Sequence, residues 1–176
     1  MKIYYDKNDI LIREMKQSDA QAITEEEIAQ GWDASADKYE MRLRDQSEGK
    51  AVALAAEYHG KIAGYVNVYF NSEWGAFANQ GYPEIVDFGV LEKYRKRGIG
   101  SKLMDVAEQI ASEYSDTVCL GVGLHAGYGS AQRMYVKRGY IPDGTGVWYQ
   151  DAVCGQNADC RNDDDLVLYF SKKLEK

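Results

Sequence analysis

The chain has 176 residues, a formal net charge of −7, 45% hydrophobic residues and 28% charged residues. These values are typical of a folded globular protein with a core of its own. The negative balance argues against a general nucleic-acid binder, because such proteins hold phosphates with a basic surface. No apolar run reaches the roughly 18 residues of a membrane span, and the start MKIYYDKNDILIREM has no signal-peptide core. We expect one cytoplasmic domain over residues 1–176, with no membrane or nucleic-acid partner.

The cysteines fit a reducing compartment. Cys119 lies in the apolar run VCLGVGL and is expected to be a buried thiol. Cys154 and Cys160 lie in one polar loop at a spacing that permits a bridge, but the expected compartment argues against a disulfide. The chain has no C-x-x-C pair with a nearby histidine, so we expect no metal.

The first half of the chain alternates between strand and helix patterns. In chain order we expect a strand at 9–15, a helix from Ser18 with Ser18 as N-cap, a second helix over about 35–48, a hairpin over 51–70 that turns near His59 and Gly60, and a loop at 71–82.

The second half continues this alternation. We expect a strand at 83–91, a helix from Ile99, a buried strand at 117–124, a short helix at 130–138 with Gly139 at its C-cap, and late strands near 145–151 and 165–171. The apolar stripe of the helix from Ile99 comprises Ile99, Leu103, Val106, Ala107, Ile110 and Tyr114. This order predicts an α/β fold with a mixed, mostly antiparallel central sheet flanked by helices.

A basic turn precedes the helix at Ile99. Lys93, Arg95, Lys96 and Arg97 are followed at once by the Gly-x-Gly of residues 98–100. The first N–H groups of a helix lack partners and carry the positive end of its dipole, and glycines let a ligand approach the backbone closely. This turn therefore predicts a phosphate or pyrophosphate site.

Two other phosphate-binding motifs do not fit the turn. A P-loop requires Lys-Ser or Lys-Thr after its last glycine, but Ser101-Lys102 follows Gly100. A dinucleotide fingerprint requires a third glycine where the chain has Leu103. A solvated basic turn and a nucleic-acid patch remain the alternatives at this point.

Two blocks carry a resemblance to a known family. Arg95-Lys96-Arg97-Gly98-Ile99-Gly100 resembles the R/Q-x-x-G-x-G/A motif of the GNAT superfamily of N-acetyltransferases. YGSAQRMYVKRGY, residues 128–140, is similar to the N-x-x-A-x-x-L-Y-x-x-x-G-F block of that family, with Met134 for Leu and Tyr128 where Asn is common. The Y-G-x-A-Q-R-x-Y form resembles one bacterial subgroup.

The resemblance implies that acetyl-CoA is the co-substrate and that the acetyl group passes directly to an amine. Residues of a central strand, the basic turn and the start of the later helix would hold acetyl-CoA: Phe88, Gly89, Val90, Arg95, Lys96, Arg97, Gly98, Ile99, Gly100, Ser101, Tyr128, Ser130 and Ala131. Gly89 is expected at a β-bulge in that strand. The N–H near Phe88 would polarise the thioester carbonyl.

Catalytic roles are implied for three side chains. Tyr135 matches the position from which the family protonates the leaving sulfur. The general base stays open between Glu84, which matches the base glutamate of some protein-acetylating members, and Asp87, a carboxylate within an apolar strand. Trp32, Trp74, Tyr82 and His125 are candidates to line the acceptor pocket.

The sequence leaves three candidate functions. The first is an acetyl-CoA-dependent N-acetyltransferase acting on a primary amine of a small molecule. The second is a protein of the same fold that binds acyl-CoA without turnover, as a sensor or interaction module. The third is a nucleotide-binding α/β protein, which the two missing motifs disfavour. Exposed aromatic residues and the late strands would suit a homodimer.

Overall fold

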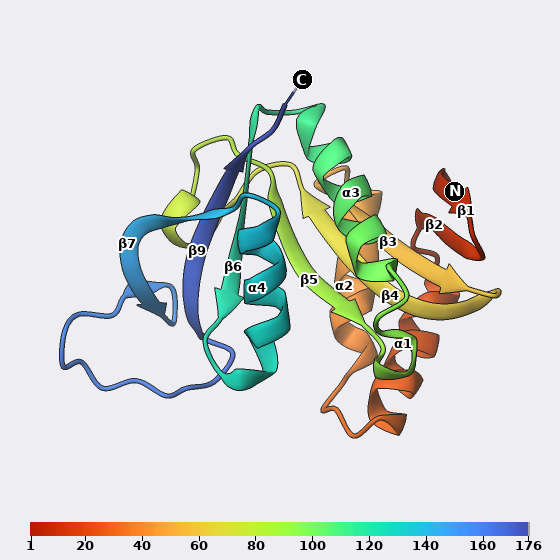
Figure 1. The fold of residues 1–176 in the computed structure, drawn as a ribbon, viewed down its shortest axis with the longest axis horizontal. Helices are drawn as coiled ribbons and strands as arrows, with labels where there is room; N and C mark the ends of the chain where they lie inside the picture. The colour runs from red at the N-terminus through yellow and green to blue at the C-terminus, as the bar shows by residue number, and fades with distance from the viewer. Residues whose placement is uncertain (176) are drawn as a thin grey trace. The chain divides into compact units, whose positions relative to one another are not determined.

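The computed structural model describes residues 1–175. They divide into two compact units: unit 1 comprises Met1–Tyr69 and Val86–Ile110, and unit 2 comprises Phe70–Ile85 and Ala111–Lys176. The strand order is β1-β2-β3-β4-β5-β6-β9-β7-β8, and the boundary between the units falls within β5 (Glu84–Val90). All strand pairings whose register is described are antiparallel except the parallel pairing of β5 with β6. The expected mixed, mostly antiparallel α/β fold is confirmed (Figure 1).

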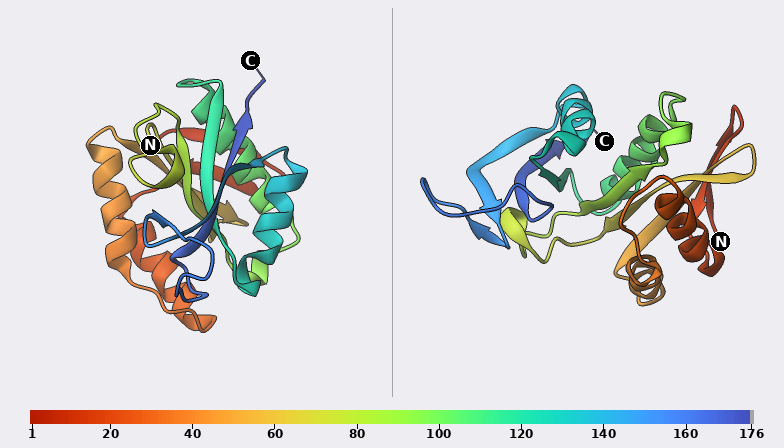
Figure 2. Two further views of the ribbon diagram at one scale, coloured as in Figure 1. Left: turned by 90° about the vertical axis from the view of Figure 1, so that its left-hand side faces the viewer. Right: turned by 90° about the horizontal axis from the view of Figure 1, so that it is seen from below.

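Unit 1 is a twisted sheet with helices on both faces (Figure 2). Its antiparallel strands are β1 (Ile3–Lys7), β2 (Ile10–Glu14), β3 (Ala51–Tyr58) and β4 (Lys61–Tyr69). Helices α1 (Gln17–Ala29) and α2 (Ala36–Ser47) cover one face, and α3 (Ile99–Ser112) covers the other. The predicted hairpin turn is confirmed, with left-handed backbone at His59 (φ 49°) and Gly60 (φ 74°).

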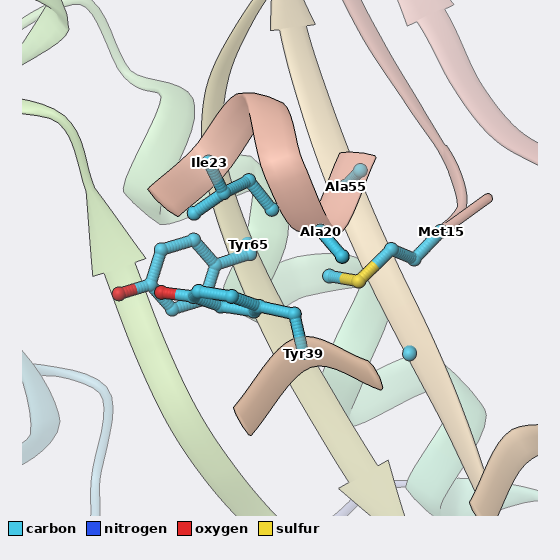
Figure 3. Packing of buried hydrophobic residues seen from close by; sticks show 7 residues of the cluster. Met15, Ala20, Ile23, Tyr39, Ala55 and Tyr65 are labelled. Carbon is cyan, nitrogen blue, oxygen red and sulfur yellow. The ribbon is translucent and has the colours of Figure 1, made fainter. Parts of the chain in front are cut away.

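The core of unit 1 under α1 and α2 is formed by Met15, Ala20, Ile23, Tyr39, Ala53, Ala55 and Tyr65 (Figure 3). The Tyr39 and Tyr65 rings meet edge to face with centroids 5.1 Å apart. Both phenols donate to the buried Glu27 carboxylate, at 2.6 Å from Tyr39. Burial and the Glu27 charge raise the pKa of both phenols, which keeps them protonated as donors.

Unit 2 contains the remaining strands and α4 (Gly129–Lys137). Strand β6 (Thr117–Gly123) pairs with β9 (Leu166–Lys173), which pairs in turn with β7 (Ile141–Tyr149), and β7 pairs with the short β8 (Ala152–Val153). Cys119 lies fully buried on β6, as expected, and burial raises the pKa of its thiol. The structure contains three free cysteines among residues 1–175, at positions 119, 154 and 160.

Some predicted details of the elements are wrong. Strand β1 was not expected, because its sequence IYYDK is largely exposed and shows no clear alternation. The N-cap of α1 is Lys16 and not Ser18, and the carboxylate of Asp19 at N3 accepts from the Lys16 N–H at 2.8 Å. The stripe of α3 is buried from Ile99 to Ile110, but Tyr114 lies beyond the helix end and is 53% exposed.

Candidate active site

In unit 1, a short loop joins β5 to α3 and carries the predicted phosphate-binding residues. After a single 3-10 turn at Glu92–Tyr94, the backbone is left-handed at Lys96 (φ 61°) and at Gly98 (φ 80°). The Gly98 carbonyl accepts from the Lys102 N–H at 3.0 Å, so Gly98 opens the helix. Left-handed residues next to a helix start turn successive N–H groups toward one point, where they can bind an anion.

The two glycines of this phosphate loop serve different purposes. A Cβ at Gly98 would have no neighbour within 4 Å, so glycine is favoured there by its positive φ alone. A Cβ at Gly100 would lie 3.1 Å from the tip of the Phe88 ring, so glycine is favoured there by close packing on β5. One glycine sets the backbone direction and the other keeps the helix start close to the strand.

Cations surround the phosphate loop. Arg95, Lys96 and Arg97 are exposed, and Lys93 forms an ion pair with Glu26 of α1. An acidic chain that places this basic cluster at a helix start has the charge and the donors that a pyrophosphate requires. The loop therefore has the features of a binding site for a diphosphate group.

Strand β5 carries Phe88, Gly89 and Val90 beside this loop. A Cβ at Gly89 would lie 2.6 Å from the Tyr65 ring, so Gly89 is needed because that ring packs on it. The backbone of the strand is left-handed at Asp87, with φ 52°, two residues before Gly89. The bulge expected at Gly89 stays a prediction.

Asp87 is held by an ion pair within unit 1. Its carboxylate accepts from Arg42 of α2 at 2.6 Å and 2.8 Å. Arg42 also donates to the Tyr69 hydroxyl at 2.6 Å, and Tyr69 donates to Asp45. This network accounts structurally for the carboxylate inside an apolar strand, because the guanidinium offsets its desolvation. The sequence did not identify Arg42 as its partner.

Trp32 lies against the phosphate loop. The Arg95 guanidinium is 5.6 Å from the centroid of the Trp32 ring, and its Nε donates to the Val90 carbonyl at 3.3 Å. Close by, the Gln30 side-chain carbonyl accepts from the Glu92 N–H at 2.9 Å. The segment that follows α1 is thus tied to the phosphate loop, and Trp32 contacts a residue predicted to bind the co-substrate.

In unit 2, Tyr135 lies on the buried face of α4. It is 6% exposed, and its ring packs on Tyr140 with centroids 5.7 Å apart. Burial raises the pKa of the Tyr135 phenol, and the Tyr128 phenol raises it further. The hydroxyl therefore stays protonated over the physiological range, in the form that can donate a proton.

Glu84 is held by a residue that sequence reasoning missed. Its carboxylate accepts from the buried Ser72 hydroxyl at 2.8 Å, and that hydroxyl lies 3.1 Å from the Trp74 carbonyl. Glu84 also raises the pKa of the Tyr169 phenol to about 12, after burial as the larger cause. Ser72 lies in the loop at 71–82. Nothing in the sequence indicated its contact with Glu84, because that contact forms only when the loop has folded.

His125 and Tyr128 both contact the carboxylate of Asp164. The Tyr128 hydroxyl donates to Asp164 at 2.8 Å, and His125 Nε2 lies 3.0 Å from the same oxygen. His125 Nδ1 accepts from the Gly127 N–H at 3.1 Å, so the hydrogen of the neutral ring is on Nε2. Tyr128, which stands where the family commonly has Asn, thus links the turn before α4 to Asp164. Asp164 was assigned no chemistry from the sequence.

The remaining predicted positions of unit 2 lie on α4 and in the loop at 71–82. Ser130 and Ala131 occupy the first turn of α4. Trp74 is 67% exposed, and Tyr82 is half-buried with its ring 6.1 Å from that of Phe77. Among residues 1–175, no group of three or more His, Cys, Asp or Glu side chains is arranged to hold a metal ion. In the same range, no helix is both long and apolar enough to cross a bilayer.

Comparisons with known proteins agree with this geometry. Residues 13–140 match the acetyltransferase (GNAT) family profile. No curated protein sequence matches the chain. Among solved structures, an acetyl transferase from Salmonella typhimurium that modifies the N-terminal serine of ribosomal protein L7/L12 is 10% identical, with a TM-score of 0.73 and coverage of 99% of this chain and 100% of that one.

Two further structures show the same fold. Ard1 from Thermoplasma volcanium is 18% identical, with a TM-score of 0.69 and coverage of 96% of this chain and 100% of that one. The putative acetyltransferase yncA from Salmonella typhimurium, solved with acetyl-CoA, is 16% identical, with a TM-score of 0.66 and coverage of 96% of each chain.

Proposed function

Because the chain belongs to the GNAT family of acetyltransferases, we propose that it transfers the acetyl group of acetyl-CoA to the primary amine of a small molecule. The observation that carries this function is the phosphate loop, with left-handed backbone at Lys96 and Gly98 directly before α3 and cations around it. A primary amine is cationic at neutral pH, and the net charge of −7 would attract such an acceptor. The Y-G-x-A-Q-R-x-Y block supports placement in one bacterial subgroup, and we place the reaction in the cytoplasm.

The chemistry requires three groups of the protein. Acetyl-CoA, when bound, supplies a thioester carbon that an amine can attack. As the new C–N bond forms and the C–S bond breaks, the amine must lose a proton and the thiolate must gain one. The N–H near Phe88 polarises the carbonyl, Glu84 takes the proton from the amine directly or through a water, and Tyr135 gives a proton to the sulfur.

Glu84 is preferred over Asp87 as the base because of their partners. Arg42 already engages Asp87 in a direct ion pair, with two guanidinium nitrogens at 2.6 Å and 2.8 Å from the same carboxylate oxygen. The contact of Glu84 with Ser72 is to a neutral hydroxyl, which donates to one carboxylate oxygen at 2.8 Å.

Tyr135→Phe is expected to lower kcat by about 100-fold, within the usual range for loss of a general acid, and to leave KM for acetyl-CoA nearly unchanged. The ring still fills its site on α4, so only the proton donor is lost. Steady-state kinetics of thiol release measure the effect. Tyr140→Phe, which removes the hydroxyl from the ring packed on Tyr135, is the matched control and is expected to keep kcat. An unchanged kcat in Tyr135→Phe would remove this residue from the acid role.

Glu84→Gln is expected to lower kcat by about 100-fold or more at pH 7, because an amide cannot take the amine proton. The Ser72 hydroxyl can donate to the new amide oxygen, so the fold should persist. Glu73→Gln changes an exposed acid eleven positions earlier and should leave kcat as it is. If Glu84→Gln is as active as the parent protein, the base is another group.

The acceptor is tested by thiol release from acetyl-CoA with a panel of small amines and of peptides with free N-termini. Thiol release with at least one small amine, and an N-acetylated product by mass spectrometry, is the expected result. Release with peptides alone would contradict the small-amine acceptor and retain the transferase. Binding of acetyl-CoA without release for any acceptor would favour the sensor that does not turn over.

A further inference from the structure

One residue of unit 1 has a backbone conformation that is unusual for its place in the fold. Asp87 lies inside β5 and has φ 52°, in the left-handed region. Among residues 1–175, the eight other non-glycine residues with positive φ all lie in turns. This conformation costs free energy in a residue other than glycine, and it persists only where surrounding contacts hold it.

Helix α2 holds the Asp87 side chain. Arg42 donates to one carboxylate oxygen of Asp87 through Nε at 2.8 Å and Nη2 at 2.6 Å. Its third nitrogen, Nη1, donates to the Tyr69 hydroxyl at 2.6 Å, and Tyr69 donates to Asp45. The side chains of Arg42 and Asp87 are only 16% and 25% exposed, so solvent screens the pair weakly. A planar guanidinium bound at all three nitrogens has little freedom to rotate, so it fixes the carboxylate that it holds.

Strand β4 holds the peptide that precedes Asp87. Asn67 is fully buried, and its Nδ2 donates to the Val86 carbonyl at 3.3 Å. Its Oδ1 has no hydrogen-bond partner within residues 1–175. A buried oxygen without a partner destabilises a fold, so an apolar residue would suit this position better if packing alone decided it. The amide is therefore explained by its contact with Val86, next to the left-handed residue.

We propose that Arg42 is a positioning residue for acetyl transfer: through Asp87 it holds the left-handed backbone that directs the N–H near Phe88 at the thioester carbonyl. This inference rests on the proposed function, in which that N–H polarises the carbonyl. The φ rotation at Asp87 is one of the two that set the angle between the peptide held by Asn67 and the peptide that follows. The Asp87 carboxylate then fixes the backbone and takes no proton from the amine.

Substitutions of Asp87 separate its backbone from its charge. Asp87→Asn retains a side chain that enters the left-handed region readily, so kcat is expected to stay within about 3-fold of the parent value. Asp87→Val places a β-branched residue there and is expected to lower kcat by about 100-fold, the cost of losing one oxyanion donor. The matched control is His59→Val, which introduces the same residue at φ 49° in the hairpin turn and should keep kcat.

Arg42→Met tests the positioning role directly. It is expected to lower kcat by about 10-fold or more, because the carbonyl and its donor are no longer aligned. In an Asp87→Gly background the left-handed backbone needs no holding contact, so Arg42→Met should change kcat by less than about 3-fold. Arg44→Met alters an exposed arginine of the same helix and should keep kcat in both backgrounds. Thiol release from acetyl-CoA with the most active small amine of the panel gives these values.

The infrared carbonyl stretch of bound acetyl-CoA, labelled with ¹³C at the carbonyl, reports polarisation without any acceptor. The parent protein and Asp87→Asn are expected to give a lower frequency than Arg42→Met and Asp87→Val, because a hydrogen bond to the oxygen weakens the C=O bond. If Arg42 served only the stability of the fold, its loss would lower Tm and leave the frequency as it is.

Three results would overturn the inference: Asp87→Asn as inactive as Asp87→Val, an Arg42→Met loss of equal size in the Asp87→Gly background, or an unchanged carbonyl frequency in Arg42→Met. If circular dichroism shows that Asp87→Val does not fold, the last two results still decide the question. Each of the three leaves the proposed function standing, because the parent protein still transfers the acetyl group. A parent protein that releases no thiol with any acceptor would instead contradict the proposed function itself.

Discussion

Replacing Gly98 by valine is expected to weaken acetyl-CoA binding by about 100-fold, which corresponds to about 2.7 kcal/mol. Gly98 has φ 80°, a region that a β-branched residue enters at a cost of about 1–3 kcal/mol. The added side chain meets no atom within 4 Å, so crowding does not contribute. The strain is relieved only if the backbone turns, and that rotation moves the N–H groups at the start of α3 away from the diphosphate.

The matched control for this prediction is Gly49→Val. Gly49 follows α2 with φ 72° and also has open space around its Cα. Its replacement should cost similar stability and leave the affinity for acetyl-CoA unchanged, so the comparison separates strain in general from strain at the loop. Calorimetry gives both affinities. An affinity of Gly98→Val within about 3-fold of the parent value would refute the role of this loop.

Arg13→Met is expected to lower the free energy of unfolding by about 3–5 kcal/mol, the usual cost of removing one partner from a buried ion cluster. Arg13 is 2% exposed and donates to both oxygens of Asp19, at 2.6 Å and 3.0 Å, and to Glu57 at 2.8 Å. The hydrogen bond to Asp19 raises the pKa of the guanidinium, which stays charged at any ordinary pH. Its loss leaves Asp19 buried without a counter-charge beneath the start of α1.

Urea unfolding at pH 7 measures this loss. Arg44→Met removes an exposed arginine of α2 and should change stability by less than about 0.5 kcal/mol. Adding Asp19→Asn to Arg13→Met should recover part of the loss, because it removes the uncompensated charge. A loss below about 1 kcal/mol in Arg13→Met would mean that water or another cation replaces the guanidinium.

Some elements could be predicted from local sequence patterns alone. The stripe of α3, the hairpin turn at His59 and Gly60, and the left-handed Gly139 after α4 all depend on residues close in sequence. The phosphate loop was predictable for the same reason, because its donors, cations and glycines lie within one short segment.

Contacts between distant residues were not predictable. Ser72 meets Glu84, Arg42 meets Asp87, and Asp164 meets Tyr128 only after the chain has folded. None of these partners has a periodic or motif signature of its own. They contact candidate site residues, so these candidates could be predicted from the sequence, but the hydrogen bonds and charges around them could not.

The most direct test of the proposed enzyme is a thermal unfolding titration with acetyl-CoA, with ATP and NAD as comparison ligands. At about 100 times its Kd a ligand adds about 2.7 kcal/mol, which in a chain of this length raises Tm by about 5–10 °C. We predict a rise of this size with acetyl-CoA and little change with NAD. No rise with acetyl-CoA, or a larger one with ATP or NAD, would contradict the assignment of the phosphate loop and the function built on it.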